Sequence, residues 1–248
     1  MIGLGTVANT SAIVVGGLLG TFFGKSIPAR CQETVTHALA GATMFVGLGG
    51  TIQAMLKAGS DGALVSHGAL MFVLSLAGGA FVGEALDLEG RFERFGAWMK
   101  KATHSEGDGH FVDAFVTTSL TFCIGAMAII GSINDGLRDD PSVLLLKSVM
   151  DGIFCMVFAA GFGKGAVFSA VPIFLYQGAL TVGARASAAI FTPAALTNLS
   201  YVGNVLIFFV GWNLLKGRRQ IRVTNLLPSL AIAVLFGLFD AQLPAILR

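Results

Sequence analysis

Charged side chains are scarce in this chain. Asp, Glu, Lys and Arg together make up 12% of its 248 residues, whereas an ordinary soluble domain has about 25%. Hydrophobic residues make up 54%, and a soluble fold of this size could not bury so much apolar surface. The net charge of +2 is small and dispersed, so a nucleic acid partner is not expected. These proportions predict a protein whose solvent is a lipid bilayer.

Cysteine pairs and the common catalytic motifs are also missing. The three cysteines, Cys31, Cys123 and Cys155, are too scattered for a CxxC pair, so we interpret them as reduced apolar residues. There is no HExxH, no histidine stands near a serine or cysteine in a nucleophile pattern, and GFGKG from Gly161 lacks the spacing of a phosphate-binding loop. The stretch HSEGDGH from His104 alternates potential ligands but is typical of a hydrated loop. We therefore expect no enzyme, no cofactor and no metal.

Long apolar runs, by contrast, recur along the whole chain. A membrane-spanning helix needs about 20 largely apolar residues, and the sequence divides into seven or eight such runs with no room for a separate soluble domain. The amino terminus lacks the features of a cleaved signal peptide, so we interpret it as part of the first span. We predict an all-α, polytopic transmembrane bundle forming a single membrane domain, 1–248. The expected spans are 3–24, 36–57, 63–84, 112–133, 143–163, 166–184, 190–215 and 225–246. The eighth is the weakest, because its apolar core is short and Asp240, Gln242 and Pro244 follow it.

The distribution of basic residues indicates an orientation. Lys and Arg in short connections favour the cytoplasm. With the amino terminus outside, the inner connections hold 11 of the 16 basic residues, namely Lys25, Arg30, Arg91, Arg94, Lys100, Lys101, Lys164, Lys216, Arg218, Arg219 and Arg222. The acidic turn from Asn134 to Pro141 then lies outside. We therefore predict an external amino terminus, and with eight spans an external carboxyl terminus as well.

One polar connection, 85–111, has a helical pattern of its own. Its apolar residues recur at spacings of three and four, at Leu88, Phe92, Phe95 and Met99. Basic and acidic residues occupy the opposite side. This pattern predicts an amphipathic helix on the inner membrane surface. A solvated extension of the third span is the alternative.

Glycine is abundant, with 33 residues, and small residues let helices approach closely in lipid. Gly16, Gly20 and Gly24 recur every four residues in the first span, which predicts a packing seam within the bundle or at a homodimer contact. The first and third spans are both rich in glycine, and the second and fourth end in GTIQ from Gly50 and GSIN from Gly131. Duplicated helical hairpins would give this pattern, although glycine-rich helices also resemble one another by chance.

Two ionisable residues lie well inside the fifth span. Lys147 and Asp151 are spaced i, i+4 and share one helix face, with Ser148 beside them. A charge at a helix centre raises the free energy of insertion by at least about 2.5 kcal/mol, so the pair requires an explanation. It is either a structural ion pair at a helix contact or a charge pair facing a water-filled pocket. In the second case Asp151 would couple to a proton or cation, and Lys147 would be its counter-charge or an anion ligand.

Uncharged polar groups lie at similar depth in other spans. Pro172 removes a backbone hydrogen bond from the sixth span, and Tyr176 and Gln177 follow one turn later. Interrupted helices often line solute sites, while a plain proline kink is the alternative. Further polar candidates are Asn9 in the first span, and Asn134 and Asp135 at the outer end of the fourth. We interpret the threonines of the fourth span, Thr117, Thr118 and Thr121, as groups that hold helices together.

Four stretches resemble the YqgA-like family of bacterial inner-membrane proteins, a family of unknown function often labelled as transport proteins. They are LTFCIGAMAIIGSINDGLR from Leu120, LKSVMDGIFCMVFA from Leu146, SAVPIFLYQG from Ser169 and RVTNLLP from Arg222. The resemblance covers nearly the whole chain. It implies a multi-pass protein of the bacterial cytoplasmic membrane, which would make the external amino terminus periplasmic. It also implies that the blocks holding the fourth-, fifth- and sixth-span candidates belong to a shared pattern.

The sequence thus leads to one functional hypothesis and one rival. The hypothesis is a small secondary transporter or channel-like carrier of an ion or small polar solute, with homo-oligomer formation left open. Its polar cavity would be lined by Asp151, Lys147, Ser148, Gln177, Tyr176, Asn134, Asp135 and Asn9. The rival is a non-transporting scaffold or sensor that acts through the amphipathic connection, with every intramembrane polar group paired inside the bundle.

Overall fold

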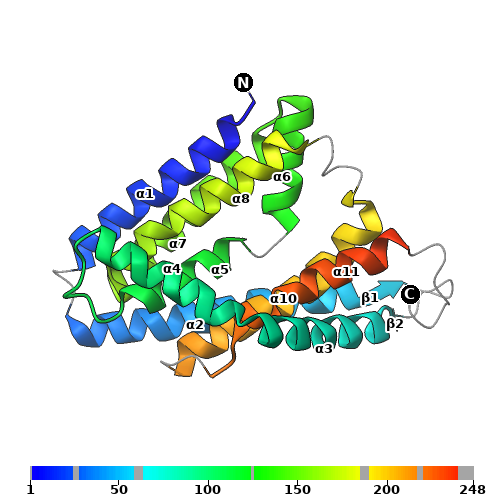
Figure 1. The fold of residues 1–248 in the computed structure, drawn as a ribbon, viewed down its shortest axis with the longest axis horizontal. Coiled ribbons are helices and arrows are strands. Elements are labelled where there is room, and N and C mark those ends of the chain that lie inside the picture. Colours follow the sequence, from blue (N-terminus) through cyan, green and yellow to red (C-terminus); the bar gives the residue numbers. More distant parts are fainter. Residues whose placement is uncertain are drawn as a thin grey trace. The chain divides into compact units, whose positions relative to one another are not determined.

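The computed structural model describes residues 2–24, 28–58, 64–123, 126–184, 190–216 and 220–239, and these are almost entirely helical (Figure 1). The α-helices are α1 (Leu4–Gly24), α2 (Ala29–Met55), α3 (Ala69–Leu86), α4 (Leu88–Ala102), α5 (Phe111–Cys123), α6 (Ala126–Arg138), α7 (Ser142–Phe162), α8 (Ala170–Val182), α10 (Pro193–Lys216) and α11 (Pro228–Leu238). Two 3-10 helices, η1 (Lys164–Ser169) and η2 (Val223–Leu226), precede α8 and α11. Strands β1 (Leu56–Ala58) and β2 (Leu64–Ser66) form a short antiparallel pair.

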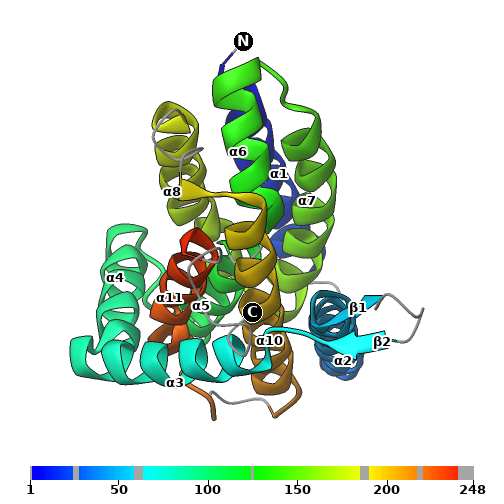
Figure 2. The same cartoon turned by 90° about the vertical axis from the view of Figure 1, so that its right-hand side faces the viewer.

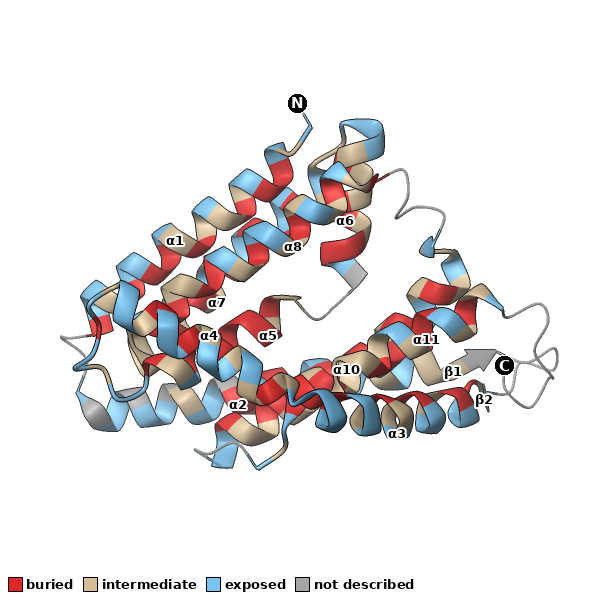
Figure 3. Ribbon diagram, in the orientation of Figure 1, coloured by how far each residue is buried: buried red, intermediate tan, exposed pale blue. Residues whose placement is uncertain are grey.

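The lengths and apolar compositions of the helices confirm the predicted all-α polytopic bundle. Among the described residues, 6 helical segments are long and apolar enough to cross a membrane, and a bent pair formed by α5 and α6 raises the number to 7. The segment Val223–Leu238 is a shorter apolar helix, and the part of the predicted eighth span beyond residue 239 lies outside the described residues. Large apolar side chains are exposed along the helices, for example Phe22, Phe45 and Phe81 at 74%, 76% and 80% (Figure 3). Such surfaces are suited to contact with lipid.

The chain divides into two compact units, which we describe separately. The first, unit 1, comprises Met1–Leu39 and Gly90–Ser187, and the second, unit 2, comprises Ala40–Glu89 and Ala188–Arg248. Each unit therefore combines segments that are far apart in sequence. The expectation of a single membrane domain stays a prediction.

In unit 1, α1 runs along α7 in the same direction, and the contact depends on glycine. Successive positions meet along the two helices: Gly16 lies against Gly152, Gly20 against Met156 and Gly24 against Ala160. A methyl group added at Gly16 or Gly20 would overlap a backbone carbonyl oxygen of α7. The three glycines of the predicted seam therefore pack within the chain. Helix α8 lies antiparallel to α1, since Thr6 is hydrogen-bonded to Thr181 and Asn9 to Gln177. Figure 2 shows α1 behind α6 and beside α7.

The predicted fourth span, 112–133, is broken near its middle. Helix α5 ends at Cys123 and α6 begins at Ala126, and the two helices are bent by 61° relative to each other. The sequence analysis did not predict this bend, because hydropathy reports composition and not the path of the backbone. Interrupted membrane helices are tolerated where protein or a solvated cavity surrounds the break.

The connection 85–111 does contain the expected helix, α4, but its apolar side packs against protein. Phe92 and Phe95 lie 5.5 and 5.7 Å from the ring of Phe115 in α5, and Met99 is buried. Trp98 remains 62% exposed. Part of the apolar face is therefore covered by protein within unit 1, and Trp98 is left exposed.

Unit 2 is built on two antiparallel helix contacts. Gly47 of α2 lies against Asn204 of α10, and Gly83 of α3 lies against Asn225 in η2. Predicted spans two and three differ from the structure where they meet, because β1 and β2 occupy residues assigned to helix ends. The core of the unit joins α3, α10 and α11 through Met71, Tyr201, Val202 and Ala233.

Within unit 2, reciprocal capping hydrogen bonds join Glu89 to Thr224 and Asn225 in η2. The backbone N–H of Glu89 donates to Asn225 Oδ1 at 2.7 Å, and the backbone N–H of Thr224 donates to Glu89 Oε2 at 3.2 Å. Each side chain thus accepts a hydrogen bond that the first turn of the other helix cannot satisfy internally. Glu89 is 8% exposed and Asn225 2% exposed, so the two caps are shielded from water.

Candidate functional site

The candidate site centres on a buried ion pair in unit 1. The ammonium nitrogen of Lys147 lies 2.9 Å from Asp151 Oδ1 and 2.8 Å from Asp151 Oδ2. The side chains are 11% and 6% exposed. Asp151 lies about 14 Å along α7 from its first residue at 1.5 Å per residue, close to half the thickness of a bilayer core of about 30 Å. The pair predicted from the i, i+4 spacing therefore forms, and it lies deep in the helix bundle.

Two amides from neighbouring helices extend this pair into a network. Asn9 on α1 donates from Nδ2 to Asp151 Oδ2 at 3.1 Å and to Gln177 Oε1 on α8 at 3.2 Å. Asn9 and Gln177 have no solvent exposure. The network thus connects α1, α7 and α8, which come from opposite ends of the sequence of unit 1. We call Asn9, Lys147, Asp151 and Gln177 the polar cluster.

The polar cluster is not internally complete. Asn9 Oδ1 and Gln177 Nε2 are buried and have no hydrogen-bond partner among the described residues. One is an acceptor and the other a donor, so a single small molecule with both kinds of group would satisfy both atoms. Leaving a buried polar group unpaired costs about 1–3 kcal/mol. The cluster therefore has one acceptor and one donor available for a polar ligand, whereas its two charges already neutralise each other.

The broken span lies beside the cluster. The ring of Phe122, at the end of α5, has its centroid 5.8 Å from Lys147 Nζ, a cation–π arrangement. Earlier in α5, the hydroxyls of Thr118 and Ser119 are fully buried and also lack partners in the part of the chain that is described. Sequence reasoning missed Phe122 and Ser119 and interpreted Thr118 as helix glue. In the sequence these three residues belong to one continuous apolar run, and nothing in that run indicates which helices lie beside it.

Asp135 forms a separate polar site at the end of α6. Its carboxylate accepts a hydrogen bond from the backbone N–H of Gly5 at 3.0 Å, and the residue is fully buried. Because Gly5 lies in the first turn of α1, the carboxylate faces the positive end of that helix dipole. Its second oxygen has no partner within the described residues.

The remaining predicted residues lie outside this network. Ser148 donates back to the carbonyl of Leu145 at 2.7 Å. The side chains of Tyr176 and Asn134 are partly exposed and form no hydrogen bond within the described parts of the chain. Pro172 is the third residue of α8, after the change from 3-10 to α geometry at Ser169, so it occupies a first turn, where a missing N–H is tolerated.

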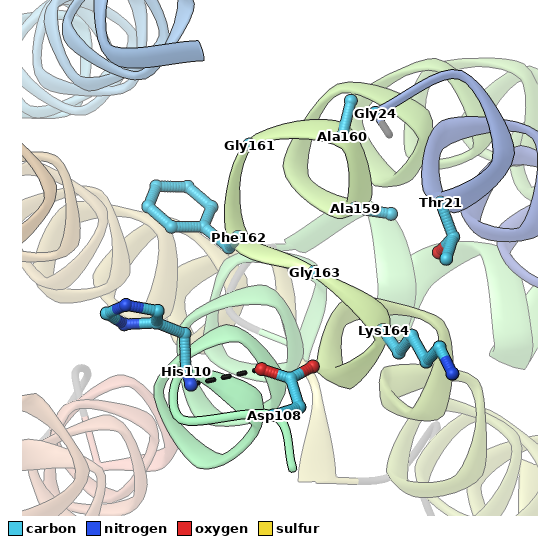
Figure 4. Close-up of a pocket in the computed structure, with 10 residues that line it drawn as sticks. All are labelled: Thr21, Gly24, Asp108, His110, Ala159, Ala160, Gly161, Phe162, Gly163 and Lys164. Atoms are coloured by element: carbon cyan, nitrogen blue, oxygen red, sulfur yellow. Dashed lines mark hydrogen bonds between the residues drawn. The ribbon is translucent and has the colours of Figure 1, made fainter. Parts of the chain in front are cut away.

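A hollow of about 330 Å³ lies at the carboxyl end of α7 (Figure 4). Thr21, Asp108, His110 and Lys164 are among its lining residues. Asp108 Oδ1 accepts a hydrogen bond from the backbone N–H of His110 at 3.0 Å. Among the described residues, no group of three or more His, Cys, Asp or Glu side chains is arranged to hold a metal ion.

These observations define a multi-pass helical membrane protein with a buried polar cluster. The chain belongs to the family described as "Protein of unknown function (DUF554)", whose model matches residues 4–238. It is 30% identical over 228 residues to the "Uncharacterized membrane protein YdfK" of Bacillus subtilis, covering 92% of this chain and 93% of that protein. It is 28% identical over 236 residues to the "Uncharacterized protein YqgA" of Escherichia coli, covering 93% and 94%. The predicted family resemblance is confirmed. No solved structure matches the chain significantly.

Proposed function

We propose that this protein is a small secondary transporter or channel-like carrier of an ion or small polar solute. The observation that carries the proposal is the buried, complementary pair of unpartnered groups, Asn9 Oδ1 and Gln177 Nε2, beside the Lys147–Asp151 ion pair. A purely structural cluster would be expected to satisfy its buried amides, because each unsatisfied group destabilises the fold. In a cluster that binds a solute, the unpartnered amide atoms would form hydrogen bonds to that solute.

The charges of the cluster favour a guest of modest net charge. Lys147 and Asp151 neutralise each other at contact distance, so a neutral or zwitterionic solute can enter without leaving an isolated charge in a low-dielectric interior. A proton or small ion would instead have to separate the pair. In either case Asp151 is the acceptor nearest to Asn9, and movement of Asn9 or Gln177 would loosen its contact with Lys147.

The bend between α5 and α6 is a place where the backbone could rearrange when a solute binds the polar cluster. Phe122 lies over Lys147 Nζ at the end of α5, and α6 leaves at 61° to α5. Broken helices beside a site near the centre of the bilayer are a recurrent feature of secondary transporters. We propose that rearrangement at this break opens and closes access to the polar cluster.

We also propose an orientation in the bacterial cytoplasmic membrane. The parallel α1–α7 contact and the antiparallel α1–α8 contact are consistent with alternating spans that begin with an external amino terminus. The excess of basic residues in the predicted inner connections supports the same orientation. The bacterial relatives make the cytoplasmic membrane the proposed location, with the amino terminus in the periplasm.

Flux into proteoliposomes of the purified protein tests the proposal. An internal pH dye and a panel of common ions, amino acids and organic acids would be used, with Asp151→Asn and Gln177→Met beside the wild type. Gly178→Ala is the matched control, since a methyl group there would meet no atom within 4 Å. Protein-dependent flux that falls in both variants and persists in the control is expected. Absence of flux across the panel, from folded and correctly inserted protein, would refute the proposal and favour a scaffold or sensor.

A further inference from the structure

Unit 2 contains a small, partly open pocket that no residue of the polar cluster lines. Its volume is about 100 Å³, and its walls come from the end of α2, the start of α3 and the first half of α10. The lining residues are Ala54, His67, Gly68, Ala194, Thr197, Asn198 and Tyr201. Pockets for drug-sized ligands usually exceed about 300 Å³, so this one suits an ion or a molecule of a few heavy atoms.

The pocket walls offer hydrogen-bond donors and no carboxylate. Asn198 uses its amide nitrogen for the carbonyl of Ala233 at 3.3 Å and keeps a second N–H. Tyr201 is only 3% exposed, and its hydroxyl forms no hydrogen bond within the described residues. Its ring is held by stacking on Phe72 at a centroid distance of 4.6 Å. The Tyr201 hydroxyl is therefore available as a donor to a ligand in this pocket.

The start of α3 adds a positive electrostatic contribution to the same pocket. Gly68, a wall residue, is the residue before α3, has φ of 71° and provides no side-chain cap. The first N–H groups of an uncapped helix carry partial positive charge and favour an anion nearby. Together with the donors of Tyr201 and Asn198, this helix end favours an anion, and the lining residues include no carboxylate for a hard cation.

We propose that this pocket binds a small monovalent anion, of the size of chloride, nitrate or formate. Tyr201 and Asn198 would donate to the anion, and the amino end of α3 would stabilise its charge. The site lies wholly in unit 2, so the proposal stands or falls independently of transport through the polar cluster.

Anion-dependent thermal unfolding of the purified full-length protein tests this site. Chloride, nitrate and formate would be titrated as potassium salts against gluconate at constant ionic strength, because a ligand bound to the folded state raises the melting temperature saturably. We expect Tyr201→Phe to weaken the apparent affinity by about three- to tenfold, the loss of one hydrogen bond. Tyr176→Phe, at the other of the chain's 2 tyrosines, should leave it unchanged.

A second variant tests the pocket by charge, and its melting temperature without added anion shows whether loss of the Asn198 hydrogen bond to Ala233 destabilises the fold. Asn198→Asp keeps the size of the side chain but places a negative charge in the pocket, and we expect it to abolish saturable anion binding. No saturable stabilisation of the wild type by any of the three anions would overturn the proposal. Equal affinities in wild type, Tyr201→Phe and Asn198→Asp would do so too, since they would locate the binding elsewhere.

Discussion

Removing the charges of Lys147 and Asp151 singly and together separates a structural ion pair from a functional one. In Lys147→Met the carboxylate of Asp151 stays buried without its counter-charge, and in Asp151→Asn the ammonium group is left alone. Breaking a buried pair in this way typically costs about 3–5 kcal/mol. In the double variant no isolated charge remains, and Asn9 still has a side-chain oxygen to which it can donate. We expect the double variant to recover to within about 1 kcal/mol of the wild type.

The measurement combines unfolding with flux. For a chain of this size a loss of 3 kcal/mol corresponds to a fall in melting temperature of about 6–12 °C, which is readily measured in detergent. The same preparations would be reconstituted to measure flux. If the pair serves transport, the double variant should be stable and inactive. If the pair is only structural, the double variant should regain both stability and flux.

Two results would refute this reasoning. Single variants that unfold within about 1 kcal/mol of the wild type would contradict the burial and pairing of the charges. A stable double variant with undiminished flux would remove the pair from the solute path. The two single variants and the double variant form a double-mutant cycle. Its coupling energy measures the ion pair better than either single change, because each single change also leaves one charge buried without a partner.

Three further predictions follow from packing, capping and orientation. Gly20→Ala should destabilise the protein by about 1–3 kcal/mol, because its methyl group would overlap the α7 backbone, whereas Gly178→Ala should not; chemical denaturation compares them. Glu89→Ala and Asn225→Ala should each cost about 1 kcal/mol of unfolding free energy as lost caps, and combining them should cost less than the sum if the caps depend on each other. A reporter fused after Arg248 should be active only outside the cytoplasm, and cytoplasmic activity would remove the eighth span.

The long spans were predictable because their signal is local. Helices α1, α7 and α10 begin and end within about three residues of the predicted spans, since twenty consecutive apolar residues have few other stable arrangements. The i, i+4 pairing of Lys147 with Asp151 was predictable for the same reason, because helix geometry alone brings the two side chains together.

The rest of the site depends on which helices are neighbours, and no local pattern encodes that. Asn9 and Gln177 are separated by 168 positions in the chain and are joined by one hydrogen bond. The break after Cys123 lies inside a run of apolar residues, where composition is the same on both sides. For α4, the periodicity predicted the amphipathic helix, but Phe115, against which its apolar face packs, lies in a different element.

What distinguishes a binding cluster from a structural one is therefore its unused bonding capacity, not its charge. Lys147 and Asp151 would look the same in either case, because a buried pair is weak evidence for any role. Asn9 and Gln177 are different. They are joined by a hydrogen bond from Nδ2 to Oε1, but Asn9 Oδ1 and Gln177 Nε2 are buried without a partner among the described residues. In lipid there is no bulk water to satisfy those atoms. The proposed transport role therefore depends on these two atoms more than on the ion pair, and flux measurements across a chemical panel would test whether a polar solute binds them.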